Sequence, residues 1–162
     1  MLYKLVKMTT TDIQNYLKGL DTPFVLLLVG PPLSGKDTFI RNLNLSGVEV
    51  ISRDEIVLES SAGMNYNQAF RTVNQKQVDK ILKEKLVKAS ESNSNVIINM
   101  TNLRKKKRNS FLMKFGDKFK KIAVVFPVLS IEEYQARNQN RTIQEGKTIA
   151  ISIIQDMLNG FE

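Results

Sequence analysis

Two glycines, a lysine and three oxygen-bearing side chains lie together in one short stretch, Gly30-Pro31-Pro32-Leu33-Ser34-Gly35-Lys36-Asp37-Thr38. Gly30 and Gly35 allow the backbone to curl so that its N–H groups point inward. A helix that begins here adds partial positive charge at its N-terminus, and Lys36 can reach the β- and γ-phosphates of a nucleotide. The spacing therefore predicts a phosphate-binding loop for a nucleoside triphosphate such as ATP.

The residues on either side of this loop support the prediction. Phe24–Val29 is an apolar run typical of a buried parallel strand. On the other side, Phe39, Ile40 and Leu43 recur at helical spacing. A strand, a glycine-containing loop and a helix in this order are the context that the motif requires.

A magnesium ligand is expected in the same loop, and two residues are candidates for it. A Ser or Thr usually follows the lysine and binds Mg²⁺. Here Asp37 stands at that position and Thr38 comes next. The Asp37 carboxylate is a hard oxygen ligand, although it adds negative charge beside the phosphates. The Thr38 hydroxyl is the alternative, and the sequence leaves both open.

The composition narrows the available chemistry. The 162 residues have the size of one domain, and 42% of them are hydrophobic. Neither Cys nor His occurs, so thiolate chemistry and the usual general base are excluded, and acid–base work falls to carboxylates, lysines or tyrosines. No apolar run approaches about 18 residues and no signal-peptide core is evident. We expect a cytoplasmic protein (host cytoplasm if phage-encoded) with no membrane partner.

The net charge is +8, and five positive charges belong to one run, Arg104-Lys105-Lys106-Lys107-Arg108. A solvated helix face is one interpretation of such a run, and a polyanionic partner is the other. The run opens the predicted helix after strand 96–99, where positive charge opposes the helix dipole. That position favours contact with the phosphates of a bound nucleic-acid strand.

Strand and helix patterns alternate along the chain. This alternation predicts an α/β fold, a P-loop NTPase-type three-layer αβα domain with a central parallel sheet of four to five strands, over residues 23–162. Residues 1–22 are expected to add a short helical extension. The expected strands are 24–29, 48–52, 96–99 and 122–126, and the expected later helices are about 67–91, 130–140 and 149–158.

Ligands of such folds bind at the carboxyl ends of the strands, where several candidate residues should meet. Asp54 follows strand 48–52 and could accept the proton of an attacking hydroxyl; capping of the next helix is the alternative role. Arg137 and Arg141 share one helix face and could close over a transferring phosphoryl group, with residues 141–147 as a mobile lid. Support of a helix C-terminus is the alternative for these arginines.

Together these pieces resemble the kinase domain of phage-type 5′-hydroxyl polynucleotide kinases. The matching segments keep the family's order and similar spacing: residues 30–38, 51–54, 96–103 and 137–141. The resemblance implies transfer of the ATP γ-phosphate to a 5′-OH end of DNA or RNA, with Mg²⁺. It implies Lys36 on the phosphates, Asp54 as general base and Arg137 or Arg141 as clamps. Family members often carry a phosphatase domain, which we do not expect here because the chain stops at Glu162.

Two positions depart from the family pattern. The family typically has an Arg three residues after the base, where this chain has Val57, and an Asp before the Thr-Asn pair, where this chain has Met100. The joint loss indicates a changed acceptor site. We predict that substrate contacts come from Arg53, Thr101, Asn102, Arg104 and Lys105.

Three functions stay open at this point. The first is an ATP-dependent polynucleotide 5′-kinase, which the basic run favours. The second is a small-molecule or nucleoside monophosphate kinase, because the Gly-Pro-Pro opening of the loop also resembles nucleotide kinase loops. The third is a nucleotide-dependent nucleic-acid binding module without transfer activity, which Asp37, Val57 and Met100 support. The sequence predicts no oligomeric state.

Overall fold

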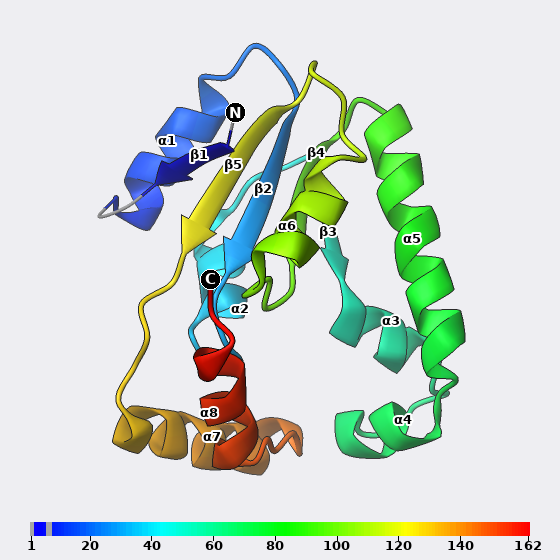
Figure 1. Ribbon diagram of the computed structural model, residues 1–162, viewed down its shortest axis with the longest axis vertical. Coiled ribbons are helices and arrows are strands. Elements are labelled where there is room, and N and C mark those ends of the chain that lie inside the picture. The colour runs from blue at the N-terminus through cyan, green and yellow to red at the C-terminus, as the bar shows by residue number, and fades with distance from the viewer. Residues whose placement is uncertain (1, 6–7) are drawn as a thin grey trace.

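A computed structural model describes residues 2–5 and 8–162 (Figure 1). Five strands form one sheet in the order β1-β5-β2-β4-β3, and each neighbouring pair is parallel. The strands are β1 (Leu2–Leu5), β2 (Phe24–Val29), β3 (Val48–Ser52), β4 (Asn95–Asn99) and β5 (Lys120–Val125). The predicted α/β fold with a central parallel sheet is confirmed.

The central strand β2 explains the three layers. All six of its side chains are buried, and they alternate between two hydrophobic cores. Val25, Leu27 and Val29 belong to one core, whereas Leu26 and Leu28 belong to the other. A strand that is apolar on both faces needs a helical layer on each side.

Two helices supply one layer and four contribute to the other. α1 (Thr10–Lys18) and α2 (Lys36–Leu43) pack on the core of Leu26 and Leu28. The opposite core contains residues of α3 (Arg53–Glu59), α4 (Tyr66–Thr72), α5 (Gln75–Glu91) and α6 (Lys105–Leu112). Among the described residues, no helix is both long enough and apolar enough to cross a bilayer.

The remaining helices lie beyond the carboxyl ends of the strands. α7 (Ile131–Glu145) and α8 (Ile151–Asn159) follow β5 and lie below the sheet in Figure 1, across from α3 and α4. The phosphate loop, between β2 and α2, opens at the same edge. The fold therefore brings together segments that are more than 100 residues apart in sequence.

The segment 1–22 contains a strand in addition to the expected helix. β1 occurs there and pairs with β5, from Leu2 opposite Lys121 to Leu5 opposite Val124. A four-residue strand carries too little periodicity to be read from sequence, and its partner lies far along the chain. The helix expected in this segment is present as α1.

Two helix predictions also change. The long helix expected over 67–91 is two helices, because Val73 is extended and the Asn74 side chain caps α5 by accepting hydrogen bonds from two backbone N–H groups. α7 continues past residue 140 to Glu145 and ends at Gly146, which has a φ of 63°. The first part of the predicted lid is therefore helical.

Candidate active site

The loop between β2 and α2 has the predicted curl. Gly35 has a φ of 97°, and a Cβ atom on Gly30 would lie 2.7 Å from Ser34 Oγ and 2.9 Å from Phe126 Cβ. Both positions therefore require glycine. The Gly30 N–H donates to the Thr101 carbonyl at 3.0 Å, which ties the loop to the segment after β4.

Lys36 folds back onto this loop. Its Nζ donates to the carbonyls of Gly30 at 2.9 Å and Pro31 at 2.6 Å. Burial lowers the pKa of the Lys36 ammonium to about 8, although Asp37 and Asp54 act in the opposite direction. Lys36 is thus a cation that gains much by meeting a phosphate.

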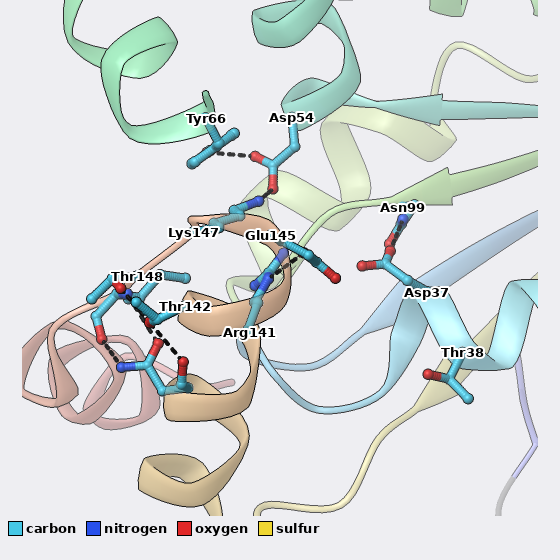
Figure 2. A network of polar contacts seen from close by, with 12 residues as sticks. Asp37, Thr38, Asp54, Tyr66, Asn99, Arg141, Thr142, Glu145, Lys147 and Thr148 are labelled. Carbon is cyan, nitrogen blue, oxygen red and sulfur yellow. Dashed lines mark hydrogen bonds and ion pairs between the residues drawn. The ribbon is translucent and has the colours of Figure 1, made fainter. Parts of the chain in front are cut away.

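The two candidate magnesium ligands have different surroundings. Asp37 Oδ1 accepts a hydrogen bond of 2.8 Å from Asn99 Nδ2 at the end of β4, so its carboxylate is oriented at the cleft (Figure 2). The Thr38 hydroxyl instead accepts from Arg41 Nη2 at 3.1 Å. No group of three His, Cys, Asp or Glu side chains that could hold a metal occurs among the described residues. Mg²⁺ commonly binds through one carboxylate, phosphates and water, and Asp37 fits that arrangement.

A cleft of about 1700 Å³ runs along the carboxyl ends of the strands. This volume exceeds that of a typical single-ligand site and suits a nucleotide together with a second substrate. Basic side chains outnumber acidic ones on its walls. The basic residues are Lys36, Arg41, Arg53, Arg71, Lys107, Arg137, Arg141 and Lys147, and the acidic residues are Asp37, Asp54, Glu55 and Glu145.

Asp54 lies in the first turn of α3, directly after β3, and two residues engage it. Tyr66 Oη on α4 donates to Asp54 Oδ1 at 2.7 Å, and Lys147 Nζ forms an ion pair with Asp54 Oδ2 (Figure 2). Burial raises the pKa of the Asp54 carboxyl, but Lys147 and these hydrogen bonds outweigh it and hold the pKa below its usual value. Asp54 is therefore ionised in this structure at neutral pH.

From the sequence, Lys147 is only the last residue of the expected lid, with no role of its own. It follows the Gly146 cap of α7 and is 6% exposed. Its Nζ lies 3.6 Å from the centroid of the Tyr66 ring, which adds a cation–π contact. Burial lowers the pKa of Lys147, and Asp54 partly restores it. Nothing local in the sequence indicated this contact, since Lys147 is 93 positions from Asp54.

Arg137 and Arg141 both line the cleft from α7 but have different partners. Arg137 Nη1 donates to the Leu33 carbonyl of the phosphate loop at 3.0 Å. Arg141 Nε pairs with Glu145 Oε2 at 3.1 Å on the same helix. A capping box formed by Ser130 and Glu133 starts α7, where a helix was expected. The helix therefore places two cations beside the loop, and their roles stay predictions.

Asn102, a predicted substrate contact, has a structural role in this fold. It is 3% exposed, and its Nδ2 donates to the Leu28 carbonyl at 2.8 Å, which links the segment after β4 to β2. Arg53, another predicted contact, lines the cleft but is held by Asp79 at 3.0 Å and Gln75 at 2.7 Å on the α5 side. Thr101 lines the cleft, and its contact with substrate stays a prediction.

The basic run also divides by role. Lys107 is the member of the run that lines the large cleft. Arg104 lines a hollow of about 390 Å³ beside α8, which adjoins the large cleft and shares Thr101 and Lys107 with it. The Lys105 N–H donates to Glu162 Oε2 at 2.8 Å. Arg108 donates to the Asn102 and Leu103 carbonyls and to the chain end. Arg104 and Lys105 do not line the large cleft itself, and their contact with substrate stays a prediction.

The two departures from the family pattern have different surroundings. Val57 is fully buried in the core beneath α3 and does not line the cleft. Met100 is partly buried, packs against the same core and also lines the cleft. Met100 is thus the one of the two that can influence a bound substrate directly.

The sequence matches a family model, and the fold matches several solved structures. A family model described as an AAA domain matches residues 25–162, and no curated protein matches the sequence. Two solved structures titled as Pnkp1/Rnl/Hen1 complexes, the first an RNA repair complex, are similar at 24% and 25% identity, with TM-scores of 0.67 and 0.54. This chain aligns over 86% and 72% of its own length but spans only 44% and 39% of those chains.

A gluconokinase from Sinorhizobium meliloti shares the fold at 16% identity and a TM-score of 0.53, with 87% of this chain and 76% of that chain covered. A kinase from Chloroflexus aurantiacus, described as putative in its title, shares it at 15% identity and a TM-score of 0.56, with 84% and 76% covered. Because the family model spans residues 25–162, the chain belongs to the AAA domain family, and its fold is that of a P-loop kinase.

Proposed function

We propose that this protein is an ATP-dependent kinase that transfers the γ-phosphoryl group to the 5′-hydroxyl end of DNA or RNA. One observation carries the proposal: the Asp54 carboxylate shares a cleft with Lys36 of the phosphate loop and with Arg137 and Arg141. A base beside a phosphate site, with cations around both, is the arrangement that phosphoryl transfer to a hydroxyl requires.

In the proposed reaction, the oxygen of the acceptor hydroxyl attacks the γ-phosphorus and its proton passes to Asp54. The bond from the γ-phosphorus to the β,γ-bridging oxygen breaks, and ADP leaves. Lys36 and the α7 arginines would stabilise the charge on the phosphoryl oxygens. Asp37, oriented by Asn99, would hold Mg²⁺, which when bound neutralises phosphate charge.

Asp54 must receive the acceptor while Tyr66 and Lys147 contact it. An ionised carboxylate has about four lone-pair sites, so an acceptor hydroxyl can be a third partner. Lys147 keeps Asp54 ionised and therefore available for the proton. The lowered pKa also makes Asp54 a weak base, and movement of residues 141–147 away from it would make it a stronger one.

The RNA repair structures support a nucleic-acid acceptor, since their chains are similar to this one at 24% and 25% identity. A small-molecule acceptor is the second candidate. It is favoured because two members of the basic run contact Glu162 at the chain end: the Arg108 guanidinium donates to its main-chain oxygen and the Lys105 backbone N–H donates to its side chain. The fold shared with a gluconokinase is compatible with it.

Labelled ATP and a panel of acceptors test the proposal. The panel contains 5′-OH DNA and RNA oligonucleotides, nucleoside monophosphates and gluconate, each with Mg²⁺. We expect label on the oligonucleotides, with a Michaelis constant that rises steeply with salt because counterions are released. Label only on a monophosphate or on gluconate would replace the proposal with the second candidate. Binding of ATP and oligonucleotide without transfer would show a binding module.

A further inference from the structure

One wall of the cleft, beyond Asp54, is unusually apolar for a charged site. Leu58 on α3, Met64 in the following turn and Phe70 on α4 all line it. Their exposed fractions are 43%, 43% and 45%, which is high for large apolar side chains at the wall of a cleft. We call these residues, together with Tyr66 and Arg71, the α4 wall. Exposed apolar side chains grouped inside a cleft indicate a ligand with an apolar surface.

The aromatic rings of this wall lead directly to the proposed base. The Tyr66 and Phe70 rings are 5.9 Å apart between centroids and inclined by 31°. Tyr66 bonds Asp54, and the Lys147 ammonium covers its ring. Phe70 contacts no other ring and no cation among residues 2–5 and 8–162. The Phe70 ring is therefore the aromatic surface on this wall with room for a flat ligand.

Among the described residues, a cation without an acidic partner lines the same cleft as this ring. Arg71 follows Phe70 on α4 and lines the same cleft. Within the described part of the chain, no acidic side chain pairs with Arg71, whereas Arg53 and Arg141 each have one. α4 itself carries no Asp or Glu. An arginine without an acidic partner, in the same cleft as an exposed aromatic ring, is a combination that can bind a nucleotide: the ring stacks on the base and the arginine meets a phosphate.

We propose that the α4 wall is the platform for the acceptor's terminal nucleobase. The base stacks on Phe70, Leu58 and Met64 cover its edges, and Arg71 contacts the phosphate that follows it. This inference rests on the proposed function, and it names the part of the acceptor that the site reads. A sugar acid has no flat apolar face, so a gluconate acceptor would leave Phe70 unused.

The chain contains no Trp, which makes a direct binding test possible. Phe70→Trp places a single fluorophore on the α4 wall. It is titrated, without ATP, with a 5′-OH oligonucleotide and with the same oligonucleotide carrying an abasic 5′-terminal residue. We expect quenching by the first and an affinity for the abasic strand that is about 5- to 150-fold weaker, the range that one stacked base contributes. Equal quenching and equal affinity for both strands would overturn the proposal.

Met113→Trp is the matched control. Met113 is 83% exposed at the end of α6 and does not line the cleft, so its fluorescence should respond to neither strand. A Phe70→Trp signal that depends on protein concentration and not on oligonucleotide would show that the wall binds a second copy of this chain, which also overturns the proposal. Circular dichroism establishes that both variants fold.

Phe70→Ala and Phe70→Leu connect binding to turnover. With the base-bearing acceptor, both variants should raise KM by at least about 5-fold and leave kcat within about 2-fold, and with the abasic acceptor neither should change KM. Equal effects on both acceptors would assign Phe70 a structural role. Base-dependent quenching without label transfer to any acceptor would leave the platform standing and reject the kinase proposal. Label transfer with equal quenching by both strands would support the kinase proposal and reject the platform.

Discussion

Two parts of the same cleft are built in different ways. One is the phosphate loop, and the other is the part around Asp54, Tyr66 and Lys147, which we call the acceptor end because the proposed acceptor binds there. The loop is one stretch, residues 30–38, shaped by glycine backbone and by carbonyls that bind Lys36. The acceptor end joins Asp54 after β3, Tyr66 on α4 and Lys147 after α7 through side-chain contacts alone. Substitutions in the loop should therefore change the reaction without changing the contacts of neighbouring side chains. Substitutions at the acceptor end should also alter the pKa of the side chains that remain there.

The largest effect is expected at the loop, from Lys36→Met. The variant should lose about 10³-fold or more in kcat, because the phosphoryl group loses its buried cation. Its thermal unfolding should occur at or above the wild-type temperature, since a desolvated ammonium is replaced by an apolar chain. Labelled-ATP assays and thermal melts measure the two quantities. Turnover within tenfold of wild type would show that the loop does not position the γ-phosphate.

Asp54→Asn tests the acceptor end. It should lower kcat by about 100- to 1,000-fold, the usual contribution of a general base, while the Kd for ATP stays within about 3-fold. Glu55→Gln is the matched control, because Glu55 is the next residue, lines the same cleft and bonds neither Tyr66 nor Lys147. Equal activity of the Asp54 variant and its control would remove Asp54 from the reaction.

The pH dependence of ATP binding sharpens the description of the loop. Burial holds the pKa of Lys36 at about 8, and a bound triphosphate favours the charged form, so binding takes up a proton above that pH. The Kd for ATP should be constant below about pH 8 and then rise by up to about tenfold per pH unit. Calorimetric titrations in two buffers of different ionisation enthalpy measure the proton uptake. A Kd that is flat to pH 9.5 would contradict the lowered pKa.

Lys107 tests whether the basic run contributes a phosphate contact in the cleft. Lys107→Gln should reduce the slope of log affinity against log salt by about 0.7 for a single-stranded oligonucleotide, as expected for one lost phosphate contact. Lys106→Gln is the control, because Lys106 is exposed and does not line the cleft. Fluorescence anisotropy at four salt concentrations gives both slopes. Identical slopes in the two variants would show that the run is a solvated helix face.

The smallest effect at neutral pH is expected from Lys147→Met, and it appears on the acid side of the pH profile. Lys147 lowers the pKa of Asp54, so without it burial dominates and the pKa rises. A base must be ionised, so the acid limb of the kcat/KM profile should move to higher pH. Arg41→Met, at the loop end of the cleft, is the control and should leave that limb in place. An unmoved limb in the Lys147 variant would separate the ion pair from catalysis.

The parts of the fold that have strong local patterns could be predicted. The bounds of β2 and β3 match the sequence prediction, because buried parallel strands are continuous apolar runs. The strand β1 and the break before α5 were missed. A four-residue strand shows no periodicity, and the break depends on whether Asn74 caps a new helix or continues the old one.

The site residues could likewise be predicted where a local pattern or a strand end positions them. Lys36 and Asp54 lie in the cleft, where the strand-end rule places them. The Asn102 amide binds a carbonyl of β2, although the residue also lines the cleft, and its predicted contact with substrate stays a prediction. The contact between Lys147 and Asp54 was not predicted. The sequence does not show whether a side-chain amide or ammonium group binds a ligand or another part of the chain.

The sequence alone determined the phosphate loop of this protein, because such a loop needs only nearby residues: two glycines, a lysine and the strand and helix that flank them. Tertiary structure decided the acceptor end. In the folded chain, Lys147 pairs with Asp54 and Arg108 donates to the chain end. Leu58, Met64 and Phe70 line the same cleft. Those outcomes depend on how helices pack at the strand ends, and packing joins residues whose separation in sequence carries no periodic signal.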